Sequence, residues 1–173
     1  MSIATRKGDT GTTGLLHGQR VAKDHPQIEA VGAFDELNVE VGAARMLASD
    51  PAVGELLKGF QASLIAVMGE IACAEEDAAG HSQSKFALLG EGDLRQLDGV
   101  LAALESKVTR LDGWATPGGT PEALALDRAR VAARRAERRL AAQGGGMRPL
   151  LMQWTNRLSD VLFVMARAAE PRD

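Results

Sequence analysis

Apolar side chains recur every three or four residues through most of this 173-residue chain, and this spacing limits the fold more than any other feature. Residues spaced in this way lie on one face of an α-helix, whereas a half-buried strand alternates with period two. The spacing is clearest in segment 93–111, at Leu94, Leu97, Leu101, Leu104, Val108 and Leu111. A chain with this pattern is expected to be built from helices packed side by side.

Composition also favours helices over strands. Aromatic residues make up 3% of the chain and tyrosine is absent, although strands favour aromatic and β-branched side chains. The pattern predicts helices over residues 27–47, 52–76, 93–111, 121–143 and 149–170, with loops at 80–92 and 114–119. Asp93 is predicted to cap the third helix, and Thr120 followed by Pro121 to start the fourth. We therefore predict an all-α fold, an antiparallel five-helix bundle.

Residues 1–26 lack a helical period and are rich in glycine and threonine. We predict a loop-rich N-terminal arm (1–26) that precedes a bundle (27–173) within a single domain. Glycines allow backbone N–H groups to face an anion, and threonine and lysine side chains add donors. The arm has no GxxxxGK[ST] phosphate-binding loop, and on composition alone a flexible tail is the favoured interpretation.

The charges are unevenly distributed. A formal net charge of −3 argues against a protein that binds nucleic acid mainly through phosphate contacts. The fourth predicted helix nevertheless carries an arginine cluster, in which Arg130 and Arg134 lie one turn apart. Such a pair is repulsive unless anions lie between the guanidinium groups, and Glu137 could orient Arg134. A polyphosphate or partner carboxylates would suit this face, and a solvated basic surface is the alternative.

Other polar residues are less informative. Asp35 and Asn38 flank the apolar stripe of the first helix, and Asn156, Asp160 and Arg167 share a predicted polar face of the fifth. Exposed polar residues are ordinary on amphipathic helices, so each of these alone is more often a surface position than part of a site. The loop at 114–119 is too short to enclose Trp114, so its indole must pack on the bundle, lie exposed or await a ligand.

Cysteine and histidine are sparse. The single cysteine, Cys73, cannot form an internal disulfide, which suits a reducing compartment, and its apolar neighbours predict a buried core residue. His17, His25 and His81 show no zinc-ligand spacing and no ExxH pair, so no metal-ligating side chains are predicted. With no signal-peptide core and no run of about 18 apolar residues, a cytoplasmic protein without a membrane partner is expected.

Taken together, the motifs resemble those of the PduO-type ATP:cob(I)alamin adenosyltransferases. The resemblance covers most of the chain in the family's order. The matching segments are TRKGDTG (5–11), GQRVAKD (18–24), EAVGAFDELN (29–38), PGG (117–119), RRAER (134–138) and NRLSD (156–160). Arg6 stands where the family usually has lysine, Trp114 stands where it usually has phenylalanine, and a Gly-Gly-Gly linker precedes the last helix.

The resemblance implies transfer of the 5′-deoxyadenosyl group of ATP to the cobalt of cobalamin, with Mg²⁺, an electron donor and a homotrimer. The arm would bind the triphosphate through Thr5, Arg6, Lys7, Gly8, Thr13, Gly14 and Lys23. The adjacent subunit would complete that site with Arg134, Arg135, Glu137, Arg138 and Asn156. Arg130 would pair with Asp35 across the subunit interface, and Trp114 would lie against the lower face of the corrin ring.

Arg134, Arg130, Asp35 and Trp114 are accordingly the residues predicted for catalysis. The resemblance also accounts for the absence of an evident acid–base pair, because cob(I)alamin attacks carbon without help from a base. A non-catalytic ATP-sensing or corrinoid-carrying bundle is the alternative, followed by a purely structural helical oligomer with a solvated arginine face.

Overall fold

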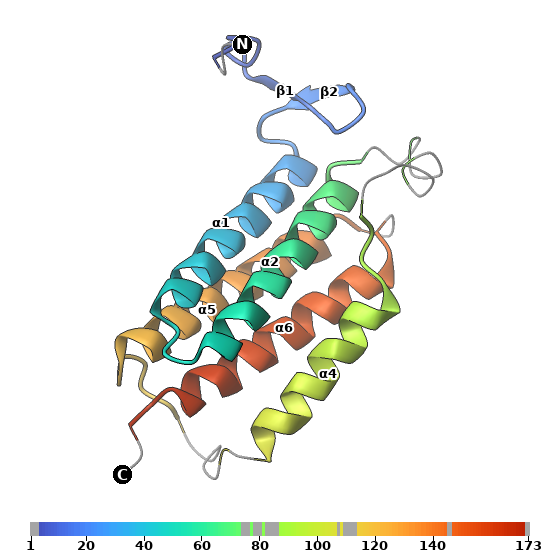
Figure 1. Ribbon diagram of the computed structural model, residues 1–173. Coiled ribbons are helices and arrows are strands. Elements are labelled where there is room, and N and C mark those ends of the chain that lie inside the picture. The colour runs from blue at the N-terminus through green and yellow to red at the C-terminus, as the bar shows by residue number, and fades with distance from the viewer. Residues whose placement is uncertain are drawn as a thin grey trace.

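The computed structural model describes residues 4–73, 77, 81, 87–106, 108, 114–144 and 147–171. Among these residues, five helices and a two-stranded hairpin make up the fold (Figure 1). The strands are β1 (Thr12–Gly14) and β2 (Arg20–Ala22), and the helices are α1 (Pro26–Leu47), α2 (Pro51–Ile71), α4 (Glu91–Glu105), α5 (Pro121–Ala141) and α6 (Pro149–Ala168). The predicted helical bundle is therefore confirmed.

Helix α5 lies at the centre of the packing. It contacts α1 on one side and α6 on the other, while α2 packs on α1 and α4 packs on α6. Short connections make α1 and α2, and likewise α5 and α6, antiparallel neighbours (Figure 1). The face that α5 buries consists largely of alanine, at Ala129, Ala133 and Ala136, and these small side chains allow close approach of both neighbouring helices.

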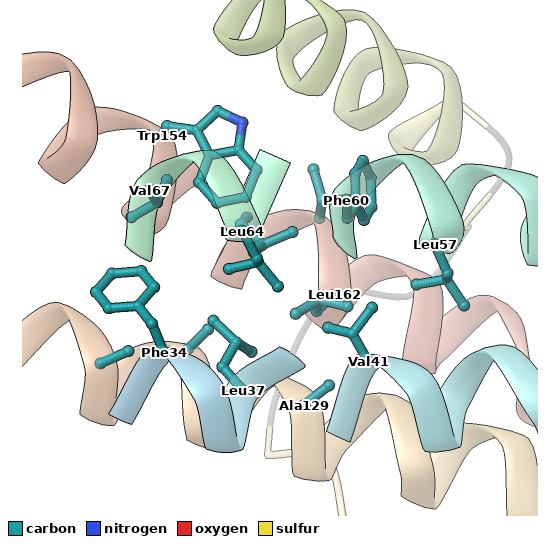
Figure 2. Close-up of a cluster of buried hydrophobic side chains, with 14 of the residues drawn as sticks. Phe34, Leu37, Val41, Leu57, Phe60, Leu64, Val67, Ala129, Trp154 and Leu162 are labelled. Carbon is teal, nitrogen blue, oxygen red and sulfur yellow. The ribbon is translucent and has the colours of Figure 1, made fainter. Parts of the chain in front are cut away.

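The core lies between α1, α2, α5 and α6 (Figure 2). Trp154 and Phe34 are the largest fully buried side chains, and burying a large apolar side chain contributes roughly 1.5–3 kcal/mol. Helix α4 differs, because Leu97 alone among its described residues is fully buried. The other apolar residues of its predicted seam that the structure describes, Leu94, Leu101, Leu104 and Val108, are partly buried, so α4 lies at the edge of the bundle.

Helices α2 and α4 end several residues earlier than predicted, whereas α5 and α6 end within two residues of the prediction. Helix α2 ends at Ile71 instead of 76, because donors from elsewhere bind its last carbonyl groups. Gln27 Nε2 donates to Ile71 O at 2.6 Å, and the backbone N–H of Leu16 donates to Ala72 O at 2.9 Å. Helix α4 ends at Glu105, and Val108, predicted as helical, lies outside it. Leu111 lies outside the described residues.

Of the two predicted helix caps, Thr120 and Asp93, the first is confirmed. Thr120 Oγ1 accepts a hydrogen bond from Ala123 N at 3.0 Å, which confirms Thr120 as the cap of α5. Asp93 is not the cap of α4, so that prediction was wrong. The cap is Gly90, and Asp93 lies three residues inside the helix, where its Oδ2 accepts from Gly90 N at 2.8 Å. The acidic group thus satisfies the start of the helix from within its first turn.

The N-terminal arm contains a short hairpin that the sequence did not predict. Strands β1 and β2 are antiparallel, with Thr13 opposite Val21 and Gly14 opposite Arg20. Each strand has three residues, too few for an alternating pattern to stand out. The hairpin lies beyond the N-terminal end of α1 (Figure 1). Across the described part of the chain, no helix combines the length and apolar character needed to span a membrane.

Candidate functional site

The arginines of α5 line two separate hollows. The larger, of about 630 Å³, lies between α1 and α5, and its lining includes Asp35, Arg135 and Arg138. The smaller, of about 330 Å³, lies between α4, α5 and α6, and its lining includes Arg134 and Asp160. Arg130 lines both hollows. Arg134 and Arg135 are neighbours in sequence but line different hollows. The resemblance had implied that both belong to one nucleotide site.

Several of the arginines are neutralised by α1. Arg139 Nε lies 3.1 Å from Glu29 Oε1, Arg135 pairs with Glu36, and Arg128 Nη2 lies 2.8 Å from Glu40 Oε1. The hydrogen bond and charge of Glu40 raise the pKa of Arg128. Water screens exposed pairs of this kind and they contribute little to stability, so their main effect is to cancel charge along this side of α5.

Arg134 and Arg138 differ from these neighbours. Both are exposed, and neither side chain forms a hydrogen bond or ion pair with any residue that the structure describes. Glu137, expected to orient Arg134, instead accepts a hydrogen bond from Asn156 Nδ2 at 3.1 Å. The structure thus brings Glu137 and Asn156 together and leaves two guanidinium groups available to an anion.

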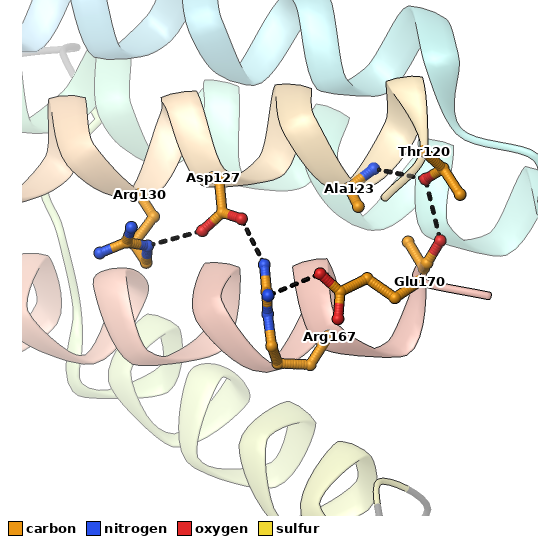
Figure 3. A network of polar contacts seen from close by, with 7 residues as sticks. Thr120, Ala123, Asp127, Arg130, Arg167 and Glu170 are labelled. Atoms are coloured by element: carbon orange, nitrogen blue, oxygen red, sulfur yellow. Dashed lines mark hydrogen bonds and ion pairs between the residues drawn. The ribbon is translucent and has the colours of Figure 1, made fainter. Parts of the chain in front are cut away.

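A buried polar network joins the N-terminal half of α5 to the end of α6 (Figure 3). Asp127 is 3% exposed and accepts hydrogen bonds from two arginines, Arg130 Nε at 2.9 Å and Arg167 Nη2. Arg167 also donates to Glu170 Oε1 at 2.6 Å. The Phe163 ring lies beneath both guanidinium groups, 6.0 Å from that of Arg130 and 5.4 Å from that of Arg167, within range of cation–π attraction.

The sequence alone does not predict this network, because its longest link joins residues 40 positions apart. Arg167 was placed on an exposed polar face with Asn156 and Asp160, and that expectation was wrong. Its side chain is 5% exposed, whereas Asn156 and Asp160 lie at the surface. The available signal was local: Asp127 and Arg130 have the i, i+3 spacing of a helical ion pair.

The network orients Arg130. With its Nε bound to Asp127 and its guanidinium over Phe163, the remaining nitrogens are held at the wall of both hollows. Asp35 is exposed and lines the larger hollow with Arg130. Within the described chain no hydrogen bond or ion pair joins Asp35 to Arg130. Their pairing across a subunit interface stays a prediction.

The arm brings several of the predicted phosphate-binding residues together. Arg20, which was not among them, donates to Lys7 O at 2.8 Å and to Thr12 Oγ1 at 2.5 Å. The backbone of Lys23 donates to Gly11 O at 2.9 Å, and the Lys23 side chain passes close to Gly8. Thr5, Arg6 and Lys7 are exposed. The arm therefore presents lysine and arginine side chains around a turn.

Replacing Gly8 with alanine is expected to weaken anion binding by the arm. A Cβ atom at Gly8 would lie 3.1 Å from Lys23 Nζ and 3.2 Å from Lys23 Cε, so the flexible lysine must move. Losing one charge-assisted hydrogen bond of about 1.5–3 kcal/mol corresponds to roughly 10–100-fold in affinity for inorganic triphosphate. Isothermal titration calorimetry measures this affinity. Gly59→Ala, where the added Cβ meets no atom within 4 Å, is the matched control and should bind triphosphate like the original chain.

Trp114 is fully exposed, in the loop that leads into α5. Of the three expectations for this indole, packing on the bundle is excluded. The end of the loop is anchored, since Thr120 Oγ1 donates to Ala169 O at 2.9 Å. Gly119 also lies close to the residues that follow α6, because a Cβ atom added at Gly119 would be 3.3 Å from Glu170 Cγ. An exposed tryptophan therefore projects from a loop fixed to the end of α6.

Cys73 is buried, as predicted. Burial raises the pKa of its thiol, and the nearby Asp77 carboxylate adds to the increase. A thiolate, and not a thiol, is the nucleophilic form of cysteine. Cys73 is therefore not expected to act as a nucleophile.

Comparison with known proteins gives a consistent result. The cobalamin adenosyltransferase family model matches residues 3–169. The corrinoid adenosyltransferase PduO of Citrobacter freundii is 37% identical over 172 residues, which cover 98% of this chain and 50% of that protein. The chain thus spans about half the length of that relative. The cobalamin adenosyltransferase of Cupriavidus metallidurans is 38% identical over 168 residues, covering 95% of this chain and 86% of that protein.

Solved structures agree with the sequence comparison. A variant PduO-type ATP:corrinoid adenosyltransferase from Lactobacillus reuteri, complexed with cobalamin and ATP, superposes with a TM-score of 0.88. Its sequence identity to this chain is 29%, and the match covers 97% of this chain and 90% of that one. With a family model that matches nearly the whole chain and relatives above 30% identity, this chain belongs to the cobalamin adenosyltransferase family.

Proposed function

We propose that this chain transfers the 5′-deoxyadenosyl group of ATP to the cobalt of reduced cobalamin and releases triphosphate. The observation that carries the proposal is the pair of exposed, unpaired guanidinium groups, Arg134 and Arg138, on the helix that bears the family's RRAER motif. A cationic surface of this kind suits the departing triphosphate. Solved relatives complexed with cobalamin and ATP support the choice of substrates.

The proposed reaction needs little from the protein beyond placement and charge. Cobalt(I) donates its electron pair to C5′ of ATP, the bond from C5′ to the triphosphate oxygen breaks, and the triphosphate leaves with that bonding pair. Cobalt becomes formally cobalt(III), and no proton is transferred. The catalytic groups therefore act by positioning the reactants and stabilising the charge on the leaving oxygen. A separate electron donor must supply cobalt(I), and a reducing cytoplasm suits it.

We propose that Mg²⁺ binds with the triphosphate. The cation prefers phosphate and carboxylate oxygens and retains several waters. The arm has two exposed carboxylates, Asp9 and Asp24, beside its basic residues. These could supply one or two ligands, and phosphate oxygens and water would supply the others. When bound, Mg²⁺ would neutralise part of the charge that develops on the leaving group.

We also propose a homotrimer whose subunits meet at the α1–α5 face. Val39, Leu124 and Val131 expose 67%, 44% and 55% of their surface there and line the larger hollow together with Asp35 and Arg130. Clustered exposed apolar side chains are typical of a docking surface. Among the described residues, no hydrogen bond or ion pair links the arm to Arg134 or Arg138. If the arm of one subunit lies against α5 of the next, the basic residues of the arm and the arginines of α5 would line a single site.

The Asp35–Arg130 pairing can be tested by a double-mutant cycle. Breaking a fully buried pair costs about 3–5 kcal/mol, and less when water has access. Asp35→Ala and Arg130→Ala should each weaken the trimer, and the double variant should do little further harm. Sedimentation equilibrium measures assembly. Arg130→Ala should be the more severe single change, since it also removes the contact with Asp127. Fully additive effects would argue against direct contact.

The activity itself is tested by following the visible spectrum of cobalamin with ATP, Mg²⁺ and chemically reduced cob(I)alamin. Formation of adenosylcobalamin at a rate proportional to enzyme concentration is expected. Binding of ATP and cobalamin without product would instead support the corrinoid-carrying or ATP-sensing alternative. Failure to bind either molecule would leave a structural helical oligomer.

Trp114 is expected to hold cobalt(II) in a four-coordinate state during reduction. Its exposed indole would cover the lower face of the corrin ring, exclude water and the displaced base, and so make cobalt(II) easier to reduce. Trp114→Ala should lose the four-coordinate electron paramagnetic resonance signal of cob(II)alamin with ATP, while ATP affinity changes little. Trp114→Phe should retain it. A Trp114→Ala variant that keeps the signal, or loses ATP binding instead, would contradict this role.

A further inference from the structure

Three potential metal ligands that are distant in sequence converge where the arm meets the end of α2. The ligand atoms of His17, Cys73 and His81 all lie within 4.8 Å of one another. The two imidazole rings are 5.7 Å apart between centroids and nearly perpendicular. Cys73 and His81 are 6% and 3% exposed, and His17 is exposed. The cluster thus has two buried members and one that faces water.

The backbone around this cluster is held by named contacts. Leu16 N, next to His17, donates to Ala72 O at 2.9 Å. Gln27, buried at the start of α1, donates from Nε2 to Cys73 O at 2.7 Å. Gln19 donates to the carboxylate of Asp77, between Cys73 and His81 in the sequence. Contacts from the arm and from α1 therefore hold the backbone beside His17 and at Cys73, and a contact from the arm holds Asp77.

We propose that His17, Cys73 and His81 form a zinc site. One thiolate and two imidazoles are ligands that Zn²⁺ prefers, whereas Mg²⁺ and Ca²⁺ require oxygen ligands. Zinc–ligand distances of about 2.0–2.3 Å place tetrahedral ligand atoms about 3.3–3.7 Å apart. Side-chain rotation would bring atoms now within 4.8 Å to this separation. Binding releases the Cys73 thiol proton to solvent, and water or the Asp77 carboxylate takes the fourth position.

Zinc at this position would fasten the arm to the bundle. His17 lies in the turn between β1 and β2, whereas Cys73 directly follows the cap of α2. A metal bound to both would restrict the hairpin that carries the basic side chains of the arm. The site itself does not depend on the proposed adenosyl transfer, because none of its three ligands is among the residues assigned to ATP or to cobalamin.

The experiment uses the full chain, untagged, free of cobalamin and stripped of metal. Co²⁺ titration should give a thiolate-to-cobalt charge-transfer band and the visible bands of a tetrahedral ion, saturating at one ion per chain. Competition with a chelating dye then gives the Zn²⁺ affinity. Loss of a partner that merely orients a ligand costs about 10–100-fold. His17→Gln, Cys73→Ser and His81→Gln should therefore each weaken Zn²⁺ binding by at least ~100-fold.

The third histidine provides the control. His25 caps α1, where its Nδ1 accepts from Gln27 N at 3.3 Å, and asparagine also caps helices well. His25→Asn should bind Zn²⁺ like the original chain. Because His17 is exposed, His17→Gln should keep its circular dichroism spectrum and so separates ligand loss from misfolding. The proposal is overturned if Co²⁺ gives no charge-transfer band, or if His17→Gln binds Zn²⁺ as tightly as His25→Asn. Adenosylcobalamin formation is measured separately. Its result tests the proposed adenosyl transfer, whereas the titrations with Co²⁺ and Zn²⁺ test the zinc site.

Discussion

Arg134→Ala is expected to lower the rate of adenosylcobalamin formation by about 10²–10³ under saturating ATP, the usual loss when one electrostatic donor is removed. The physical reason is that the Arg134 side chain is exposed at the smaller hollow and forms no ion pair with any described residue. Its charge is therefore available to the leaving triphosphate. The measurement is kcat from the visible spectrum with chemically reduced cob(I)alamin, so that the electron donor does not limit the rate.

The matched control for Arg134 lies on the same helix. Arg139 is equally basic but pairs with Glu29 across α1 and α5, and removing an exposed pair costs at most about 1 kcal/mol. Arg139→Ala should therefore retain normal turnover. Arg134→Lys should recover part of the rate, since it keeps the charge but loses the planar fork that suits a phosphate. If Arg134→Ala turned over like the original chain, the triphosphate would have to lie elsewhere.

The helices that could be predicted from sequence are those whose ends are set by local residues. Thr120 and Pro121 start α5, and Pro149 starts α6, because capping and the fixed φ of proline act within one turn. The end of α2 is set differently, by donors from Leu16 and Gln27. Apolar periodicity continues past that point and carries no information about those distant donors.

The candidate site likewise has features that can be predicted from sequence and features that cannot. Family motifs predict a nucleotide site in the arm and on α5, because those residues stand in contiguous segments. They could not show that Arg135 is neutralised by Glu36 while Arg134 is not. Nor could they bring Arg167 to Asp127, or His17 to Cys73. Each of these contacts joins separate elements and depends on the packing of the bundle.

Asp127→Ala is expected to destabilise the fold by about 3–5 kcal/mol, because it removes the carboxylate that holds two guanidinium groups. The side chains of Asp127 and Arg167 are each 5% exposed, so the pair is buried. In the variant, Arg167 would keep its contact with Glu170 but lose its buried partner. Denaturant unfolding of the purified chain measures the loss. Glu55→Ala, which breaks an exposed pair with Lys58, is the control and should change the free energy of unfolding by at most about 1 kcal/mol.

A second variant separates stability from positioning. Replacing a buried ion pair by apolar side chains of similar volume is often neutral or stabilising, so Asp127→Leu combined with Arg167→Met should restore much of the free energy of unfolding. Turnover should stay low, because Arg130 loses the carboxylate that holds its Nε at 2.9 Å and no longer presents its other nitrogens to the hollows in a fixed direction. A double variant with both stability and turnover restored would show that Asp127 contributes only to the fold. A stable double variant with low turnover, whose trimer is also weakened as in Arg130→Ala, would place Asp127 in the positioning of Arg130.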